Sequence, residues 1–193
     1  MEQKTLYTVT VFSENTVGLL NQITIIFTRR GINIETLSVS PSAIENIHKF
    51  TITVFSDKNT MLKVVKQIDK RVDIIKAYFN TDEDLVYQEI ALYKISTPKL
   101  LTITSIENLV RKYNLRILDM TEVWVVLEKT GHYEETQALF EELKTLTADP
   151  DGSKNGVLQF IRSGRIAITK GKAERLSDML AAMEEKLAVK TES

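Results

Sequence analysis

The residues best suited to bind a small ligand lie between Asn15 and Asn33. Residues 16–18 stand where an alternating pattern gives way to a helical one, so the first backbone N–H groups of the predicted helix have no partner within it. Such groups, at the positive end of the helix dipole, can bind a carboxylate. Gly18 has no side chain to obstruct that approach. The alternative interpretation is that Asn15 is only a helix N-cap and Gly18 only relieves a tight turn.

Asn33 would supply a second polar group. Asparagine is disfavoured inside a strand, yet here it lies one residue into an apolar stretch that is predicted to be extended. Its amide could meet the polar groups of a ligand, or instead bond to nearby backbone and fix the local shape. Leu19 and Ile34 would line a pocket for an aliphatic side chain. A free aliphatic amino acid would satisfy all these groups.

The first half of the chain predicts a small sheet that positions this turn. Apolar residues alternate over 6–12 as in a strand, and a helical stripe over 19–27 ends at Arg29-Arg30-Gly31, a helix stop. The apolar face shifts within the next strand, 32–40, which indicates a bulge or burial on both sides. The remaining predicted elements are a strand over 50–54, a helix capped by Asp57 and a strand over 72–79. This order is the split ferredoxin-like arrangement, with an antiparallel sheet and both helices on one face.

The same order of elements recurs after the polar stretch 80–84, which has the composition of a linker. The predicted strands and helices are 86–95, 100–112, 115–120, 123–128, 134–146 and 157–161, followed by a last helix over 173–187. A loop rich in turn residues occupies 149–156. The predicted fold is therefore α+β, with two ferredoxin-like βαββαβ domains in tandem over residues 1–80 and 84–193.

Composition and residue types argue against several other functions. A net charge of −1 provides no basic field for nucleic acid or an anionic membrane, and no apolar stretch reaches the roughly 20 residues that span a bilayer. Without cysteine or a visible targeting signal, the chain is expected in the cytoplasm. His48 and His132 fall in separate predicted domains, and the paired glutamates lie side by side on helices. We therefore expect no catalytic residue and no metal site.

The segments 14–20 (ENTVGLL) and 27–37 (FTRRGINIETL) resemble the ACT domain of acetolactate synthase small subunits. Beyond them, 88–95 (QEIALYKI), 117–120 (ILDM) and 127–131 (LEKTG) are similar to strands of that family's second domain. The resemblance thus covers nearly the whole chain and is strongest over residues 8–79. The family's arginine-threonine-glycine signature appears here as Arg162-Ser163-Gly164-Arg165, after an enlarged loop at 149–155.

This resemblance implies a regulatory subunit without catalytic activity of its own. Members of the family activate a catalytic large subunit of acetolactate synthase, in branched-chain amino acid biosynthesis, and make it sensitive to feedback inhibition, usually by valine. Thiamine diphosphate, Mg and FAD are then expected only in that partner. The ligand would lie between two ACT domains of a homodimer. Carried over residue by residue, the implied contacts are Asn15, Gly18, Leu19, Asn33, Ile34 and Ser38.

Three alternative functions remain to be compared with this one. A free-standing ACT-domain sensor of amino acids would share the first domain, but the second domain's resemblance argues against it. A transcriptional regulator would need a helix-turn-helix and a basic surface, and neither is visible in the sequence. An independent enzyme would need a nucleophile and a base, which are also missing.

Overall fold

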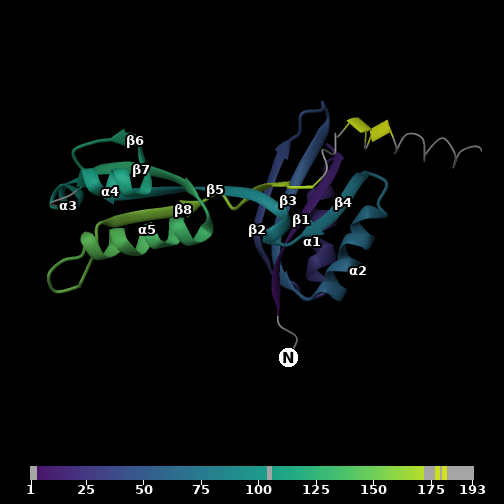
Figure 1. Cartoon of the computed structure of the whole chain (residues 1–193), viewed down its shortest axis with the longest axis horizontal. Helices are drawn as coiled ribbons and strands as arrows, with labels where there is room; N and C mark the ends of the chain where they lie inside the picture. The colour runs from purple at the N-terminus through teal and green to yellow at the C-terminus, as the bar shows by residue number, and fades with distance from the viewer. Residues whose placement is uncertain (1–3, 104–105, 172–176, 179, 182–193) are drawn as a thin grey trace, which may run out of the picture. The chain divides into compact units, whose positions relative to one another are not determined.

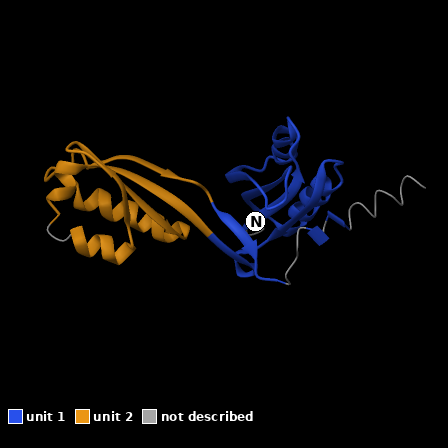
Figure 2. Cartoon of the chain, turned by 90° about the horizontal axis from the view of Figure 1, so that it is seen from above, with its two compact units in different colours: residues 1–87, 165–193 blue, residues 88–164 orange. Residues whose placement is uncertain are grey.

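The structure, a computed structural model, describes residues 4–103, 106–171, 177–178 and 180–181. The chain divides into two compact units, coloured separately in Figure 2. Unit 1 contains residues 1–87 together with the segment from Arg165 onward, and unit 2 contains residues 88–164. The acidic stretch predicted to be a linker therefore lies within unit 1, and the chain returns to unit 1 after leaving it.

Unit 1 has the predicted βαββαβ order (Figure 1). Its elements are β1 (Thr5–Glu14), α1 (Leu19–Thr28), β2 (Ile34–Pro41), β3 (Ile47–Ser56), α2 (Lys58–Asp69) and β4 (Ile74–Asn80). The sheet is antiparallel with strand order β2-β3-β1-β4, so β2 and β4 form its edges. The ferredoxin-like prediction is confirmed for this half of the chain.

Alternation along the strands gives the sheet of unit 1 two different faces. Val9, Val11 and Ile52 are fully buried on the face that packs against α1 and α2. Fully burying side chains of this size stabilises a fold by about 1.5–3 kcal/mol each. Asp57 caps α2 as predicted, since its side chain accepts the N–H of Thr60 at 2.8 Å. Threonines occupy the opposite face.

The shift in the apolar pattern of β2 has a structural cause. The pairing of β2 with β3 changes register between Ile34 and Thr36, which is a bulge. Glu35 is the extra residue, so Ile34 and Leu37 both contact the core although they are three positions apart. Of the two explanations that the sequence left open, the bulge is confirmed.

Unit 2 repeats the order with a differently built first connection. Its elements are β5 (Leu85–Ser96), α3 (Thr97–Leu101), α4 (Ile106–Tyr113), β6 (Arg116–Met120), β7 (Trp124–Gly131), α5 (Tyr133–Leu146) and β8 (Val157–Arg162). The strand order β6-β7-β5-β8 matches that of unit 1. The core is centred on Tyr93, Ile95, Leu127 and Leu139.

The prediction of one helix over 100–112 is wrong, because α3 and α4 are separate helices. The Thr102 side chain donates to the carbonyl of Lys99 at 2.7 Å, and the backbone N–H of Ile103 bonds three residues back to Leu100. β-branched residues and side-chain bonds of this kind weaken a helix, which here ends after Leu101.

Two short elements of unit 1 were not predicted. A 3₁₀ turn, η1 (Asp82–Asp84), follows β4, and a last strand, β9 (Ile166–Thr169), pairs with β5. β9 has only four residues, too few to produce a clear periodic pattern. The helix predicted over 173–187 lies largely outside the described residues.

Candidate functional site

The connection between β1 and α1 is an open turn around Gly18. This glycine has φ 84° and ψ −6°, a left-handed conformation that costs a residue with a Cβ about 1–2 kcal/mol. It stands at the N-cap of α1, where no side chain makes a capping hydrogen bond. The interpretation of Asn15 as a side-chain cap is therefore wrong. Asn15 instead fixes the turn through its backbone, since its N–H donates to the carbonyl of Asn46 at 2.8 Å.

This turn leaves donors available for a ligand. The N–H of Leu19 bonds to the carbonyl of Thr16, and that of Gln22 bonds to Gly18, both at 3.2 Å. Among the hydrogen bonds found for the described part of the chain, none has the N–H of Leu20 or Asn21 as donor. A Cβ placed on Gly18 would meet no atom within 4 Å, so the space before the helix is open. The geometry suits a carboxylate.

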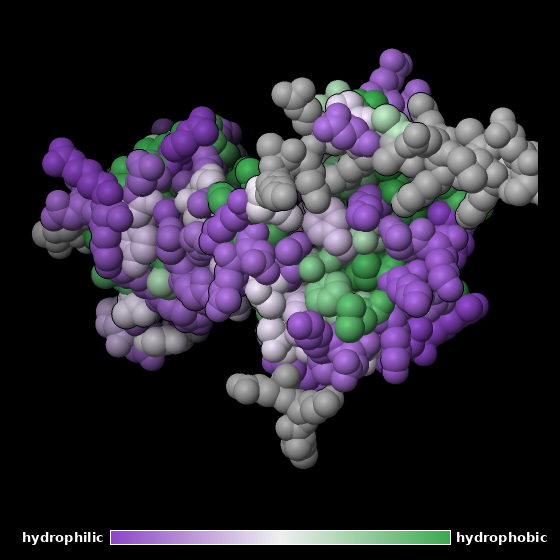
Figure 3. All heavy atoms as spheres, turned by 45° about the vertical axis from the view of Figure 1, so that its right-hand side comes forward, coloured by the Kyte–Doolittle hydropathy of each residue, from purple (hydrophilic) through white to green (hydrophobic). Residues whose placement is uncertain are grey.

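Exposed apolar side chains flank the same turn. Val17 is fully exposed and Leu20 is 44% exposed. Figure 3 shows that hydrophobic atoms are exposed among hydrophilic ones on one face of the molecule. An apolar surface beside free N–H groups is what an aliphatic amino acid requires.

The second predicted half of the site lies at the start of β2. Asn33 precedes the strand instead of lying inside it, so that prediction is wrong. Its amide donates to the Glu35 carboxylate at 3.1 Å, a side-chain contact instead of the predicted bond to backbone. Ile34 is half-buried against the core, and Ser38 lies opposite Thr51 on the sheet face without helices.

Leu19 differs from the other predicted contacts. Its side chain is 1% exposed and belongs to the core of unit 1. It holds the first turn of α1 against the sheet, and so positions the free N–H groups. Asn46, with φ 61°, lies in the β2–β3 connection and accepts the N–H of Asn15, and the sequence pattern did not single it out. An asparagine between two predicted strands was the available signal, because asparagine tolerates this conformation.

One copy of unit 1 does not bring the two halves together. In the sheet, Ile34 pairs with Val54, whereas Glu14, which precedes the turn, pairs with Ile47. Seven residues of β3 separate these positions, which corresponds to about 23 Å along the strand. The turn and the start of β2 therefore lie at opposite ends of the sheet.

The equivalent position in unit 2 is closed. There β5 runs directly into α3, with Pro98 in the first turn, and proline has no N–H to donate. The N–H of Thr97 is taken by the carbonyl of Val123 at 3.1 Å, and its hydroxyl donates to the carbonyl of Thr121 at 2.9 Å.

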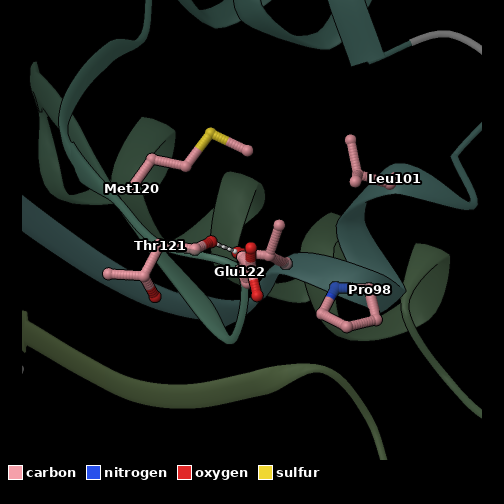
Figure 4. Close-up of a pocket in the computed structure, with 6 residues that line it drawn as sticks. Pro98, Leu101, Met120, Thr121 and Glu122 are labelled. Carbon is pink, nitrogen blue, oxygen red and sulfur yellow. Dashed lines mark hydrogen bonds between the residues drawn. The ribbon is translucent and has the colours of Figure 1, made fainter.

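An open pocket of about 650 Å³ borders this closed turn. Figure 4 shows Met120 and Leu101 on opposite sides of it, with Glu122 and Pro98 between them. Neither Pro98 nor Thr97 has a hydrogen-bond donor available to a ligand in this pocket. The Glu122 carboxylate would repel the carboxylate of a ligand. The pocket therefore lacks the carboxylate donors that the turn of unit 1 offers.

Unit 2 also holds a buried polar cluster around Glu89. Glu89 accepts the hydroxyl of Thr136 at 2.5 Å and lies 3.7 Å from Arg162, while the Tyr93 hydroxyl donates to the carbonyl of Thr136 at 2.7 Å. Burial raises the pKa of Tyr93, which keeps its hydroxyl protonated as a donor. The described residues contain no group of three or more His, Cys, Asp or Glu side chains that could hold a metal ion. Within the same residues, no helix is long and apolar enough to cross a membrane.

These features define a class of protein: a ferredoxin-like domain of ACT type, with an open β1–α1 turn, followed by a second ferredoxin-like unit. Comparison with known proteins gives the same result. Residues 9–76 match the family model described as "AHAS small subunit-like ACT domain", and residues 88–171 match the model described as "Small subunit of acetolactate synthase".

The chain belongs to the family of acetolactate synthase small subunits. It is 30% identical over 162 residues to the acetolactate synthase small subunit of Buchnera aphidicola, covering 83% of this chain and 95% of that protein. It is 29% identical over 176 residues to that of Bacillus subtilis, covering 90% and 95%. The crystal structure of the small subunit from Thermotoga maritima has the same fold, with a TM-score of 0.73 and 24% identity over 87% of this chain and 99% of that one.

Proposed function

We propose that this chain is a regulatory subunit that binds a branched-chain amino acid, with valine as the first candidate, and thereby controls a catalytic large subunit. The main support for an amino-acid ligand is the β1–α1 turn, where a left-handed Gly18 leaves free N–H groups beside exposed apolar side chains. The family of the chain supports the partner.

The position of the two half-sites supports a homodimer. Because the turn and the start of β2 are about 23 Å apart in one copy, a ligand that touches both must lie between two copies. β2 is an edge strand, which can pair with the β2 strand of a second copy. Antiparallel pairing would place the Asn33 end of each strand beside the opposite end of its partner. In this arrangement Asn15 and Gly18 would hold the ligand carboxylate, while Asn33, Ile34 and Ser38 would come from the other copy.

Regulation then requires two states of the assembly. Ligand binding changes the activity of the partner only if the ligand contacts the two states differently. A ligand shared by two copies has this property, because separating or rotating the copies breaks half of its contacts. Thiamine diphosphate, Mg and FAD are assigned to the catalytic subunit in this proposal.

Calorimetric titration of the full chain with valine, leucine and isoleucine tests the ligand. We expect saturable binding, with affinities that differ by about 10- to 200-fold among them, as one methylene group in an apolar pocket allows. If the chain bound none of the three amino acids, the proposed ligand class would be wrong. Reconstitution with a thiamine-diphosphate-dependent catalytic subunit then distinguishes this function from a free-standing amino-acid sensor, since only the regulatory subunit alters the rate of pyruvate condensation.

A further inference from the structure

The helix-free face of the sheet in unit 1 is contacted by the chain's own returning segment, since Arg165 bonds to Thr8 and Lys49 bonds to Ala167. Four threonines form the centre of this face, and none is more than 3% exposed: Thr8, Thr10, Thr51 and Thr53. They pair across β1 and β3 as Thr8 with Thr53 and Thr10 with Thr51. Both helices lie on the other face, so another segment must exclude the solvent. Figure 1 shows β9, near the yellow end of the colour bar, crossing this sheet.

One end of the covering segment is held by Arg165. This side chain is buried, and its Nη1 lies 2.5 Å from Oδ1 of Asp82 and 3.2 Å from the hydroxyl of Thr8. The guanidinium also lies 4.0 Å from the ring centre of Tyr87, whose hydroxyl donates to the other Asp82 oxygen at 3.1 Å. A charge-assisted bond and a cation–π contact therefore act together on one residue.

The rest of the segment is held by strand pairing and by lysine contacts, since β9 pairs with β5. The N–H of Lys170 donates to the carbonyl of Asp84 at 2.8 Å, and its ammonium donates to the carbonyl of Glu83 at 2.9 Å. Between the two ends, the Lys49 ammonium of β3 donates to the carbonyl of Ala167. All these residues belong to unit 1.

Apolar burial contributes little to this attachment. In β9 only Ala167 is buried, whereas Ile166 and Ile168 are 57% and 66% exposed. Burying one methyl group is worth about 0.8 kcal/mol, well below the contribution of a buried isoleucine. The threonines of the sheet tolerate both the covered and the solvent-exposed state, because their hydroxyls can bond to water when residues 165–170 move away. Removal would therefore expose no large apolar surface.

We propose that residues 165–170 form a releasable strap over the sheet of unit 1, with Arg165 as its latch. The chain leaves unit 1 at Tyr87 and returns at Arg165, so the latch decides whether the second connection from unit 2 is anchored on this sheet. The strap is a conformational device of the fold, and it stands independently of the ligand proposed above.

Thiol labelling tests the strap, because the chain contains no cysteine of its own. Thr51 lies on the covered face, two positions along β3 from Lys49, which contacts Ala167 of the strap, whereas Ala77, 6% exposed in β4, belongs to the core beneath the helices. A cysteine is placed at each position in turn. In the full chain under native conditions, we expect Thr51→Cys to react at least about 10-fold faster than Ala77→Cys, since local opening requires less free energy than unfolding of the unit. Equal rates would overturn the proposal.

Arg165→Gln tests the latch. The variant should raise the labelling rate of Thr51→Cys about 10-fold or more while leaving that of Ala77→Cys unchanged. Arg162→Gln is the matched control, because this nearby arginine contacts Glu89 within unit 2 and should alter neither rate. If the labelling rate rose at both cysteines, Arg165 would stabilise the whole unit and not the strap alone. If the labelling rate of Thr51→Cys did not rise, Arg165 would not hold the strap in place. Either result contradicts the proposal.

Discussion

The two units share one strand order, yet their first strand–helix connections have opposite properties. In unit 1, four residues separate β1 from α1, and Gly18 leaves the helix without a side-chain cap. In unit 2, no residue separates β5 from α3. The N–H and hydroxyl of Thr97 are already bonded to carbonyl groups, and Pro98 has no N–H to donate. The fold therefore provides the same position twice, and the local sequence decides which copy leaves backbone N–H groups without a partner among the described residues.

The largest expected effect comes from placing a charge in the open turn. Gly18→Asp should weaken valine binding at least about 100-fold, because the new carboxylate repels that of the ligand. Calorimetric titration of the full chain measures this effect. Gly31→Asp is the matched control, since Gly31 also has positive φ (64°) and free space at its Cβ position, but follows the end of α1 instead of preceding its start. If both variants lost affinity equally, strain would explain the result and the site would be wrong.

Removal of the amide in the second half-site should have a smaller effect. Asn33→Ala is expected to weaken valine binding about 10-fold, in line with the loss of one hydrogen bond to a charged group. The control is Glu35→Gln, which keeps a hydrogen-bond acceptor beside Asn33 and should leave the affinity within about 3-fold. Unchanged binding by Asn33→Ala would limit the site to the turn.

The closed connection should matter for stability instead of binding. Thr97→Val removes the hydroxyl that bonds to the carbonyl of Thr121 and should destabilise unit 2 by about 1–2 kcal/mol. The only tryptophan of the chain, Trp124, lies in unit 2, so fluorescence during urea unfolding reports this unit separately. Valine binding by unit 1 should not change, and a parallel loss of binding would contradict the assignment of separate roles.

Alkaline pH should also distinguish the units through Tyr93. Burial raises the pKa of this hydroxyl above its ordinary value of 10.0, so the unfolded chain releases the proton first as the pH rises. The stabilisation is complete below pH 10 and declines above it, as the rising pH favours the ionised, unfolded form. Tyr93→Phe should show a flatter decline in Trp124-monitored stability between pH 9 and about 11. Identical pH profiles would show that Tyr93 does not contribute.

The sequence predicted most of this contrast, but not all of it. Alternation and helix stop signals predicted the βαββαβ elements of unit 1, though not η1 or β9. Gly18 was recognised because a glycine just before a helix indicates a turn with unusual backbone angles. The closed connection was not predicted, because the partner of Thr97 is a carbonyl 24 positions along the chain, contributed by another turn. Arg165 was missed for the same reason, since its partners Thr8 and Asp82 are 157 and 83 positions away. Local patterns carry no information about such contacts.

The smallest expected effect is the most specific check of the comparison. Pro98→Ala restores an N–H to the first turn of α3, but the Thr97 donors remain bonded and no glycine opens the connection. We therefore expect no second valine site and a stability change within about 1 kcal/mol, because proline is already compatible with a first helical turn. Titration of Pro98→Ala should give the same stoichiometry as the unmodified chain. A doubled stoichiometry would mean that a missing N–H, and not the open glycine turn, is what separates the two units.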